Sequence, residues 1–297
     1  MNPTLKEYLQ SAVLALIQGA AELLPVSSSA HVIFAESLMG IDPSEPRATF
    51  LLVMLHTGTM GAVLVYFWRR WKRLLANTAN AGSGQPAYQF ARYVALGTVV
   101  SLMLGGVLKV LIENVILERM LHHEKGEVEQ LFRELPLVGG ALFVVGIFII
   151  AAGFFETPGI AKPLQTWSVG LIGLVQGLCI PFRGLSRSGA TISTALFCRI
   201  SRQLAEDFSF ALAVALTPFA IGWELRRLLR DENWHFSDLP HMLGPALAGM
   251  VLSFFAGLGA LYLLSAALEK GRWRYFGFYC LAAAAVMVGY AYTIHVR

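Results

Sequence analysis

The chain has 297 residues, of which 56% are hydrophobic and only 14% are charged. A soluble domain carries about a quarter charged residues, so this composition excludes an ordinary soluble protein and predicts an all-α integral membrane protein. The net charge of +4 fits basic loops; no Lys/Arg-rich face or aromatic stacking motif accompanies it, so we expect no nucleic-acid binding. Cys179, Cys198 and Cys280 lack Cys-x-x-Cys spacing, which predicts neither a disulfide nor a zinc site.

The first apolar segments of the chain are too short to cross a bilayer. Tyr8 to Leu24 would make a helix of about 25 Å, whereas the hydrocarbon core is roughly 30 Å thick. A second short run, His31 to Met39, follows directly. We therefore predict a re-entrant hairpin over about 8–40. Gln18 and Glu22 interrupt its first arm, which argues against a secretory signal.

Longer apolar runs follow, and a second short pair divides them into two sets of three. Trp167 to Ile180 and Gly189 to Ile200 form this pair, and we predict a second hairpin over about 165–200. The six predicted crossings are Phe50–Trp68, Phe90–Ile112, Leu135–Phe155, Phe208–Leu229, His241–Leu268 and Trp273–Ile294.

Each half of the chain thus contains one hairpin and three crossings. An odd number of crossings makes the second half insert upside down, as in the inverted repeats of many transporters. We predict a single membrane domain, 1–297, with repeats 1–158 and 159–297. A shift of 158 positions relates matching residues, which indicates an internal duplication. The matches are Gln18 with Gln176, Gly19 with Gly177, Ser28 with Ser186, and Phe50 with Phe208.

The basic loops predict an orientation. Four cationic residues follow the first crossing, and the acidic loop over 114–134 suits the opposite side. Both termini would then lie outside the cell. Three arginines near 226–230 count against this scheme. The four cations are Arg69, Arg70, Lys72 and Arg73.

The tip of the second hairpin carries polar residues where apolar ones are expected. A charge at bilayer depth is costly, so Arg187 is expected to face protein or water, and its planar guanidinium matches phosphate oxygens. A helix that restarts near Ser188 would direct its N–H groups at the same anion. The alternative is a cytoplasmic loop in which Arg183 and Arg187 act as topology signals. The predicted phosphate ligands here are Ser186, Arg187, Ser188 and Thr191.

The tip of the first hairpin carries an acid, a serine cluster and a histidine. Gln18 and Glu22 lie on one helix face and would suit a divalent metal; the alternative is that Glu22 pairs with an arginine. Ser28 and His31 are one turn apart, in outline a nucleophile and its base. At least one serine of the cluster is expected to cap a helix, and Ser27 is also a predicted phosphate ligand.

These motifs resemble those of the bacterial undecaprenyl-diphosphatase, or bacitracin-resistance, family. That family shows Glu/Gln-x-x-x-Glu, then Pro-Val-Ser-Ser-Ser/Thr-x-His, and later Pro-Gly-x-Ser-Arg-Ser-x-x-Thr. The corresponding residues here are Gln18 to Glu22, Pro25 to His31, and Ser186 to Thr191 after Gly184. The resemblance covers nearly the whole chain, including the His-Thr-Gly-Thr run at His56, which we otherwise interpret as a packing residue.

The resemblance implies six crossings, two re-entrant hairpins and hydrolysis of undecaprenyl diphosphate at the outer side of the bacterial cytoplasmic membrane. This reaction recycles the lipid carrier for cell-wall synthesis and gives bacitracin resistance. It further implies a divalent cation, Mg²⁺ before Ca²⁺. Glu22 and Gln18 would serve the metal or general base, Ser28 the attack, His31 proton transfer, and Arg187 the phosphate. His31 is the alternative nucleophile.

Two departures from the family pattern affect the site. Gln18 is the amide variant of its position and cannot act as a base. Phe182 and Arg183 lengthen the Pro181 to Gly184 segment by two residues, so Arg183 is either a second phosphate contact or a loop charge.

A membrane lipid or anion transporter is the alternative function, because inverted repeats with broken helices serve secondary transport. The Ser28/His31 pair argues against it, since transport needs no nucleophile. The other lipid-phosphatase class is disfavoured because no His and Asp follow Ser186-Arg187 at short spacing. The sequence leaves the oligomeric state open, a homodimer included.

Overall fold

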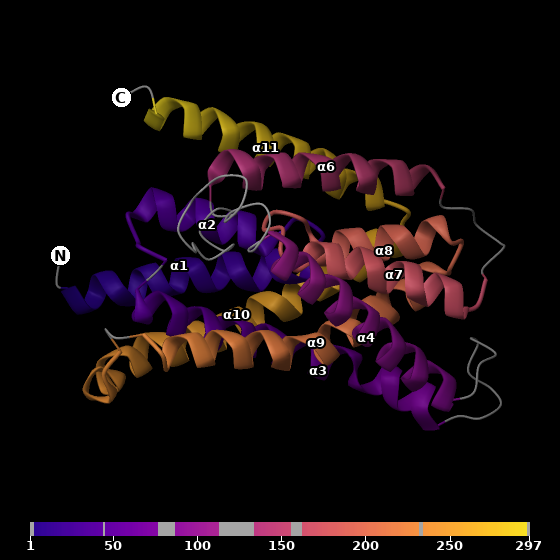
Figure 1. Ribbon diagram of the computed structural model, residues 1–297, viewed down its shortest axis with the longest axis horizontal. Coiled ribbons are helices and arrows are strands. Elements are labelled where there is room, and N and C mark those ends of the chain that lie inside the picture. The colour runs from indigo at the N-terminus through magenta and orange to yellow at the C-terminus, as the bar shows by residue number, and fades with distance from the viewer. Residues whose placement is uncertain are drawn as a thin grey trace.

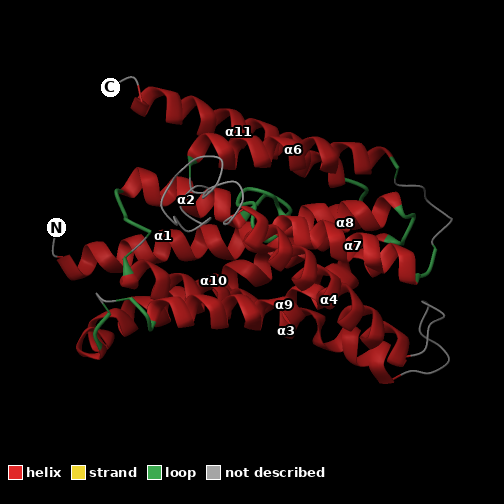
Figure 2. Ribbon diagram, in the orientation of Figure 1, coloured by secondary structure: helices red, strands yellow, loops and turns green. Residues whose placement is uncertain are grey.

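A computed structural model describes residues 3–43, 45–76, 87–112, 134–155, 162–231 and 234–295. These residues form ten α-helices, one short 3₁₀-helix and the connecting loops (Figure 2). The helices are α1 (Pro3–Leu23), α2 (Ser28–Met39), α3 (Pro46–Ala76), α4 (Ala87–Leu111), α6 (Leu135–Phe154), α7 (Thr166–Cys179), α8 (Arg187–Phe197), α9 (Arg202–Leu228), η2 (Phe236–Asp238), α10 (Leu239–Glu269) and α11 (Trp273–His295).

Six of these helices are long and apolar enough to cross a membrane, and they match the six predicted crossings. They are α3, α4, α6, α9, α10 and α11. The chain is therefore a multi-pass membrane protein. The largest differences are that α3 continues to Ala76 rather than ending at Trp68, and that α9 begins at Arg202 rather than Phe208, where Ser201 caps it by accepting the Leu204 N–H. The acidic loop over 114–134 lies almost wholly outside the described residues.

The four remaining helices form two antiparallel pairs, α1 with α2 and α7 with α8. Figure 1 shows α1 and α2 on the side where both termini lie, and α7 and α8 toward the opposite end. In each pair a serine caps the second helix: Ser27 accepts the Ala30 N–H, and Ser186 accepts the Gly189 N–H. The two breaks at the predicted tips therefore have the same local cause.

Close helix contacts place the two pairs in the bundle. The α1 helix packs on α10, and α7 packs on α4. A Cβ added to Gly19 would lie 2.6 Å from the Ser253 carbonyl oxygen, and one added to Gly177 would lie 3.0 Å from that of Ser101. Only glycine permits this approach of backbones. The Gln-Gly motif thus has a packing role at both places where it occurs.

A buried ion-pair cluster joins α3 and α9 at the end opposite the termini. Arg70 contacts the carboxylates of Glu206 at 3.0 Å and Asp207 at 2.9 Å, and both acids are nearly inaccessible. The Trp71 indole N–H donates to the Asp207 carbonyl. These contacts hold the two long helices together at that end (Figure 1).

Candidate active site

A cavity of about 260 Å³ lies between the tips of the two helix pairs. Its walls come from α1, one face of α2, the first half of α3, the 179–188 segment and the end of α9. Pro43 and Ala48 in the α2–α3 region also line it. The start of α3, which contributes to these walls, lies toward the end of the bundle that carries both termini (Figure 1).

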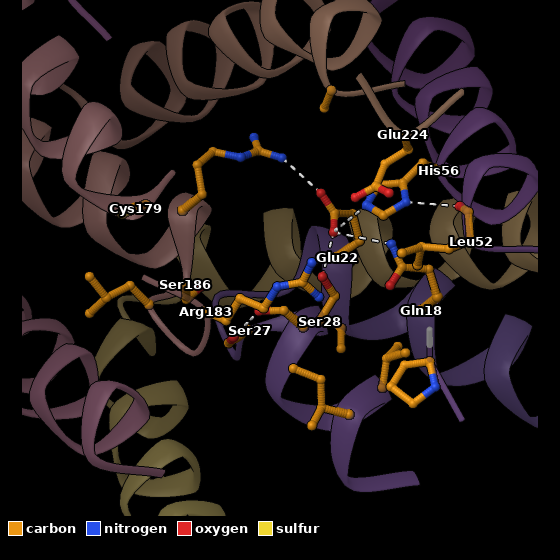
Figure 3. Close-up of a pocket in the computed structure, with 18 of the residues that line it drawn as sticks. Gln18, Glu22, Ser27, Ser28, Leu52, His56, Cys179, Arg183, Ser186 and Glu224 are labelled. Carbon is orange, nitrogen blue, oxygen red and sulfur yellow. Dashed lines mark hydrogen bonds and ion pairs between the residues drawn. The ribbon is translucent and has the colours of Figure 1, made fainter. Parts of the chain in front are cut away.

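Glu22 is the centre of the polar contacts in this cavity (Figure 3). Its Oε2 accepts hydrogen bonds from the Ser28 hydroxyl at 2.5 Å and from the Gln18 amide at 3.2 Å. Its Oε1 accepts one from Arg187 Nη2 at 3.1 Å. The two segments that carry predicted site residues, 165 positions apart in the chain, therefore meet at one carboxylate.

Arg187 has a second donor that no described residue satisfies. Its Nη1 is buried and lacks a hydrogen-bond partner among the described residues, whereas Nη2 pairs with Glu22. An unpaired buried donor on a cation is expensive. Because Arg187 lines the cavity next to the Glu22–Ser28 pair, an anionic ligand there would supply the missing acceptor.

The other predicted phosphate ligands are engaged in structural contacts. Ser27 and Ser186 cap α2 and α8 and line the cavity. Ser188 also lines it and donates to the Leu24 carbonyl at 3.2 Å. Thr191 is buried behind the cavity wall, where it bonds the Arg187 carbonyl at 2.8 Å and the Ser209 hydroxyl at 2.6 Å.

His31 is not positioned as the base for Ser28. Its Nδ1 lies 2.8 Å from the Ser27 carbonyl oxygen, its Nε2 lies 2.9 Å from the Tyr279 hydroxyl, and its ring stacks on that of Tyr279. The group in contact with the Ser28 hydroxyl is Glu22. His31 instead holds the backbone just before Ser28, where Ser27 has φ +67°, a left-handed conformation that costs a non-glycine residue on the order of 1–3 kcal/mol.

His56, interpreted from the sequence as a packing residue, lines the cavity. Its Nδ1 bonds the Leu52 carbonyl at 2.9 Å, as packing requires, but its Nε2 lies 4.0 Å from Glu22 Oε2. Glu36 and Glu224 line the cavity too and were not singled out from the sequence. Thr49, Val53 and His56 share one face of α3, but only the packing of α3 beside α1 makes that face a wall of the cavity, so the sequence alone carried no signal for His56.

The 181–185 segment brings Arg183 to the cavity. Gly184 has φ +98°, and its N–H donates to the Ser29 hydroxyl at 3.2 Å. A Cβ on Gly184 would lie 2.4 Å from the Val138 carbonyl oxygen. Arg183 lines the cavity, and Figure 3 shows its guanidinium directed toward Ser28 and Glu22.

The donor set suits a metal only together with a ligand that brings oxygen atoms. Within the described ranges there is no group of three or more His, Cys, Asp or Glu side chains that could hold a metal. Glu22 already accepts from three donors, although Gln18 could present its amide oxygen by rotating the amide group. Mg²⁺ is commonly held by one or two carboxylates and substrate phosphates, which fits this arrangement.

Comparison with known proteins decides the family. The model of the family described as "Bacitracin resistance protein BacA" matches residues 11–286. The chain belongs to the BacA family. It is 50% identical over 287 residues to "Undecaprenyl-diphosphatase 2" of Acinetobacter baylyi, which covers 95% of this chain and 97% of the relative. It is 34% identical over 299 residues to "Undecaprenyl-diphosphatase" of Desulfosudis oleivorans, covering 94% and 97%. The family resemblance of the sequence motifs is thereby confirmed.

Proposed function

We propose that this BacA-family protein hydrolyses undecaprenyl diphosphate to undecaprenyl phosphate and inorganic phosphate. The relatives' names supply the substrate. One observation on this chain supports the reaction class: Ser28 and Arg187 contact the same Glu22 carboxylate, and the buried Nη1 of Arg187 has no hydrogen-bond partner among the residues that the structure describes. A cation with a free donor, a nucleophile and a base in one cavity are the parts that phosphoryl transfer requires.

In the first step the terminal phosphate pairs with Arg187, and the Ser28 oxygen attacks its phosphorus. Glu22 takes the proton of Ser28, whose hydroxyl it already contacts at 2.5 Å. The bond between this phosphorus and the bridging oxygen breaks, and the electron pair leaves on the lipid monophosphate. This leaving group is a stable anion and needs no proton.

In the second step water attacks the phosphoserine. Glu22 passes its proton to Ser28 as the Oγ–phosphorus bond breaks, and a proton of the attacking water is released, so that inorganic phosphate leaves and the hydroxyl is restored. Arg187 neutralises the charge on the phosphate oxygens throughout. The hydrogen bond between His31 and the Ser27 carbonyl fixes the left-handed backbone conformation at Ser27. This conformation keeps the Ser28 hydroxyl directed at Glu22.

The proposal includes a divalent cation, Mg²⁺ before Ca²⁺, held by Glu22, the amide oxygen of Gln18 and the substrate's phosphate oxygens. When bound, it would supply positive charge that offsets the diphosphate. A chelator should then lower turnover, and added Mg²⁺ should restore it.

The proposed architecture is an inverted repeat, 1–158 and 159–297, with α1–α2 and α7–α8 as re-entrant hairpins. The helix contacts support it, because they follow the correspondence of α1, α3, α4 and α6 with α7, α9, α10 and α11. The α1 helix packs on α10 as α7 packs on α4, and the corresponding helices α6 and α11, and α3 and α9, pack on each other. The proposed membrane is the bacterial cytoplasmic membrane, with the termini and the cavity mouth outside. Labelling of single cysteines at positions 40 and 271 with an impermeant thiol reagent tests this, because only position 40 should react in intact cells.

Phosphate release by the purified protein in detergent tests the function. We expect release from undecaprenyl diphosphate, which a transporter without two compartments would not give. Absence of release, with or without Mg²⁺, from protein that elutes as a single species would refute the proposal. A homodimer stays a prediction, and cross-linking in membranes tests it.

A further inference from the structure

We propose that Arg183 binds the lipid-linked phosphate of the substrate and so makes this chain select a diphosphate ester over free phosphate. This inference rests on the proposed function. It concerns the lengthened segment after Pro181, in which Phe182 and Arg183 are the two residues added relative to the family pattern.

The backbone around Arg183 is fixed from two sides. Gly184 donates its N–H to Ser29, the neighbour of the proposed nucleophile, and lies against the Val138 carbonyl so closely that only glycine fits. Its φ of +98° also favours glycine. A side chain one position before such an anchor starts from a defined place, and in Figure 3 Arg183 extends into the cavity beside Ser28.

The charge in the cavity leaves a role for a second cation. Among the described lining residues, Arg183 and Arg187 are the lysine and arginine side chains, against the carboxylates of Glu22, Glu36 and Glu224. Arg187 shares its charge with Glu22 at 3.1 Å. A diphosphate ester brings two anionic groups into this partly enclosed site, so one shared arginine leaves much of their charge without a partner.

The positions of the two arginines assign one phosphate to each. The terminal phosphate must lie at the Ser28 hydroxyl, where Arg187 reaches the same carboxylate that contacts Ser28. Arg183 instead extends toward Ser28 from the segment just before Gly184 (Figure 3). The lipid-linked phosphate lies one bridging oxygen away from the terminal one. It is therefore the group that Arg183 reaches, and a guanidinium can bind it through two parallel N–H donors.

Inhibition by the two products separates these assignments. Undecaprenyl phosphate retains the lipid-linked phosphate, whereas orthophosphate corresponds to the terminal one. We compare the wild type with Arg183→Ala, Arg183→Lys and the control Arg230→Ala, which removes the same charge from an exposed position outside the cavity. For each protein we measure kcat, KM for undecaprenyl diphosphate, and inhibition constants for undecaprenyl phosphate and for orthophosphate.

We expect Arg183→Ala to raise KM and the inhibition constant of undecaprenyl phosphate by about tenfold to a hundredfold, the loss expected for a charge-assisted hydrogen bond. The constant for orthophosphate and kcat should change by less than about threefold. Arg183→Lys should be intermediate, because an ammonium keeps the charge and loses the planar fork. Arg230→Ala should match the wild type.

Three outcomes would overturn the proposal. Equal constants for wild type and Arg183→Ala would show that Arg183 contacts no phosphate. A rise confined to orthophosphate would place it on the terminal phosphate, and a fall in kcat at constant KM would give it a role in the transition state alone. If Arg183→Ala does not fold, Arg183→Gln and Arg183→Lys carry the same comparison. A wild type that releases no phosphate refutes the proposed function instead.

Discussion

The two helix pairs at the centre of the molecule share a sequence pattern and differ in what they do with it. Gln18-Gly19 and Gln176-Gly177 both place a glycine against the backbone of a long helix. The Gln18 amide then donates to Glu22 in the cavity, whereas the Gln176 amide donates to the buried Ser101 hydroxyl. The position that corresponds to Glu22 in the second pair is Ile180, an apolar residue.

The same division appears at the serines. Ser28 is the first residue of α2 and contacts a carboxylate, and the residue before it, Ser27, has φ +67°. Ser186, which matches Ser28 by the shift of 158 positions and caps α8 as Ser27 caps α2, has φ −69° and no such strain. The first pair thus contributes the carboxylate and the serine hydroxyl that we propose as base and nucleophile, and the second contributes the arginine. The two pairs therefore share a packing contact at the Gln-Gly positions and differ in the polar groups that they bring to the cavity.

Removal of the two corresponding serine hydroxyls should break this comparison most clearly. Ser28→Ala should lower kcat by at least about 10³-fold, because within the described ranges no other hydroxyl is hydrogen-bonded to Glu22. Ser186→Ala, the matched control, should cost about 1 kcal/mol of stability through the lost cap and less than about tenfold in kcat. Phosphate release and thermal unfolding in detergent measure the two effects. Near-normal turnover of Ser28→Ala would exclude it as the nucleophile.

Removal of the Glu22 carboxylate should have the next largest effect on kcat. Glu22→Gln keeps the shape of the side chain and removes the proton acceptor, so we expect kcat to fall by about 10²- to 10⁴-fold. The matched control is Glu7→Gln in the same helix, where the carboxylate pairs with Arg47 outside the cavity; its kcat should stay within about twofold. Equal losses for both variants would mean that α1 is merely destabilised, and an active Glu22→Gln would exclude Glu22 as the base.

The membrane-spanning helices, and three of the residues that the structure brings together at the cavity, could be predicted from the sequence for physical reasons. The length of each apolar run separates the six crossings from the shorter helices of the two pairs. Polar residues at the breaks in two apolar runs are costly to bury in a membrane unless they have a function, and this argument pointed to Glu22, Ser28 and Arg187. The sequence could not predict which neighbours the Ser28 and His31 side chains face. Spacing puts Ser28 and His31 one turn apart, but only the turn at Ser27 determines that Glu22 contacts Ser28 while His31 faces Tyr279.

His56 illustrates a second limit. A histidine within an apolar crossing is compatible with packing, and its bond to the Leu52 carbonyl is a packing contact. Its other ring nitrogen lies 4.0 Å from Glu22 because α3 passes beside α1 at the cavity. That crossing depends on contacts between helices, which no local pattern in either segment specifies.

Substitution of His31 should have a smaller effect on kcat and distinguishes a positioning role from a role in proton transfer. His31→Asn can still donate to the Ser27 carbonyl, so we expect kcat within about tenfold of the wild type and an unchanged shape of the pH–rate profile. Tyr279→Phe removes one hydroxyl from the same chain of contacts and should cost less than about fivefold. A loss in His31→Asn as large as that in Ser28→Ala, or the disappearance of one limb of the pH profile, would restore His31 as a catalytic group.

The smallest expected effect compares two glycines with positive φ. Gly184→Ala should lower the free energy of unfolding by about 1–3 kcal/mol, because the left-handed backbone is strained for alanine and the new Cβ meets the Val138 carbonyl. Gly40 follows the last residue of α2 with φ +63°, and a Cβ added there would meet open space. Gly40→Ala should therefore lower the free energy of unfolding by only about 1 kcal/mol. Thermal unfolding of both variants in detergent measures the difference.

Because Gly184 also anchors the segment that carries Arg183, Gly184→Ala should raise KM for the diphosphate, while Gly40→Ala should leave KM unchanged. Equal unfolding and equal KM would mean that the second tip is held elsewhere, and that the contact between Gly184 and Ser29 does not join the two halves of the site.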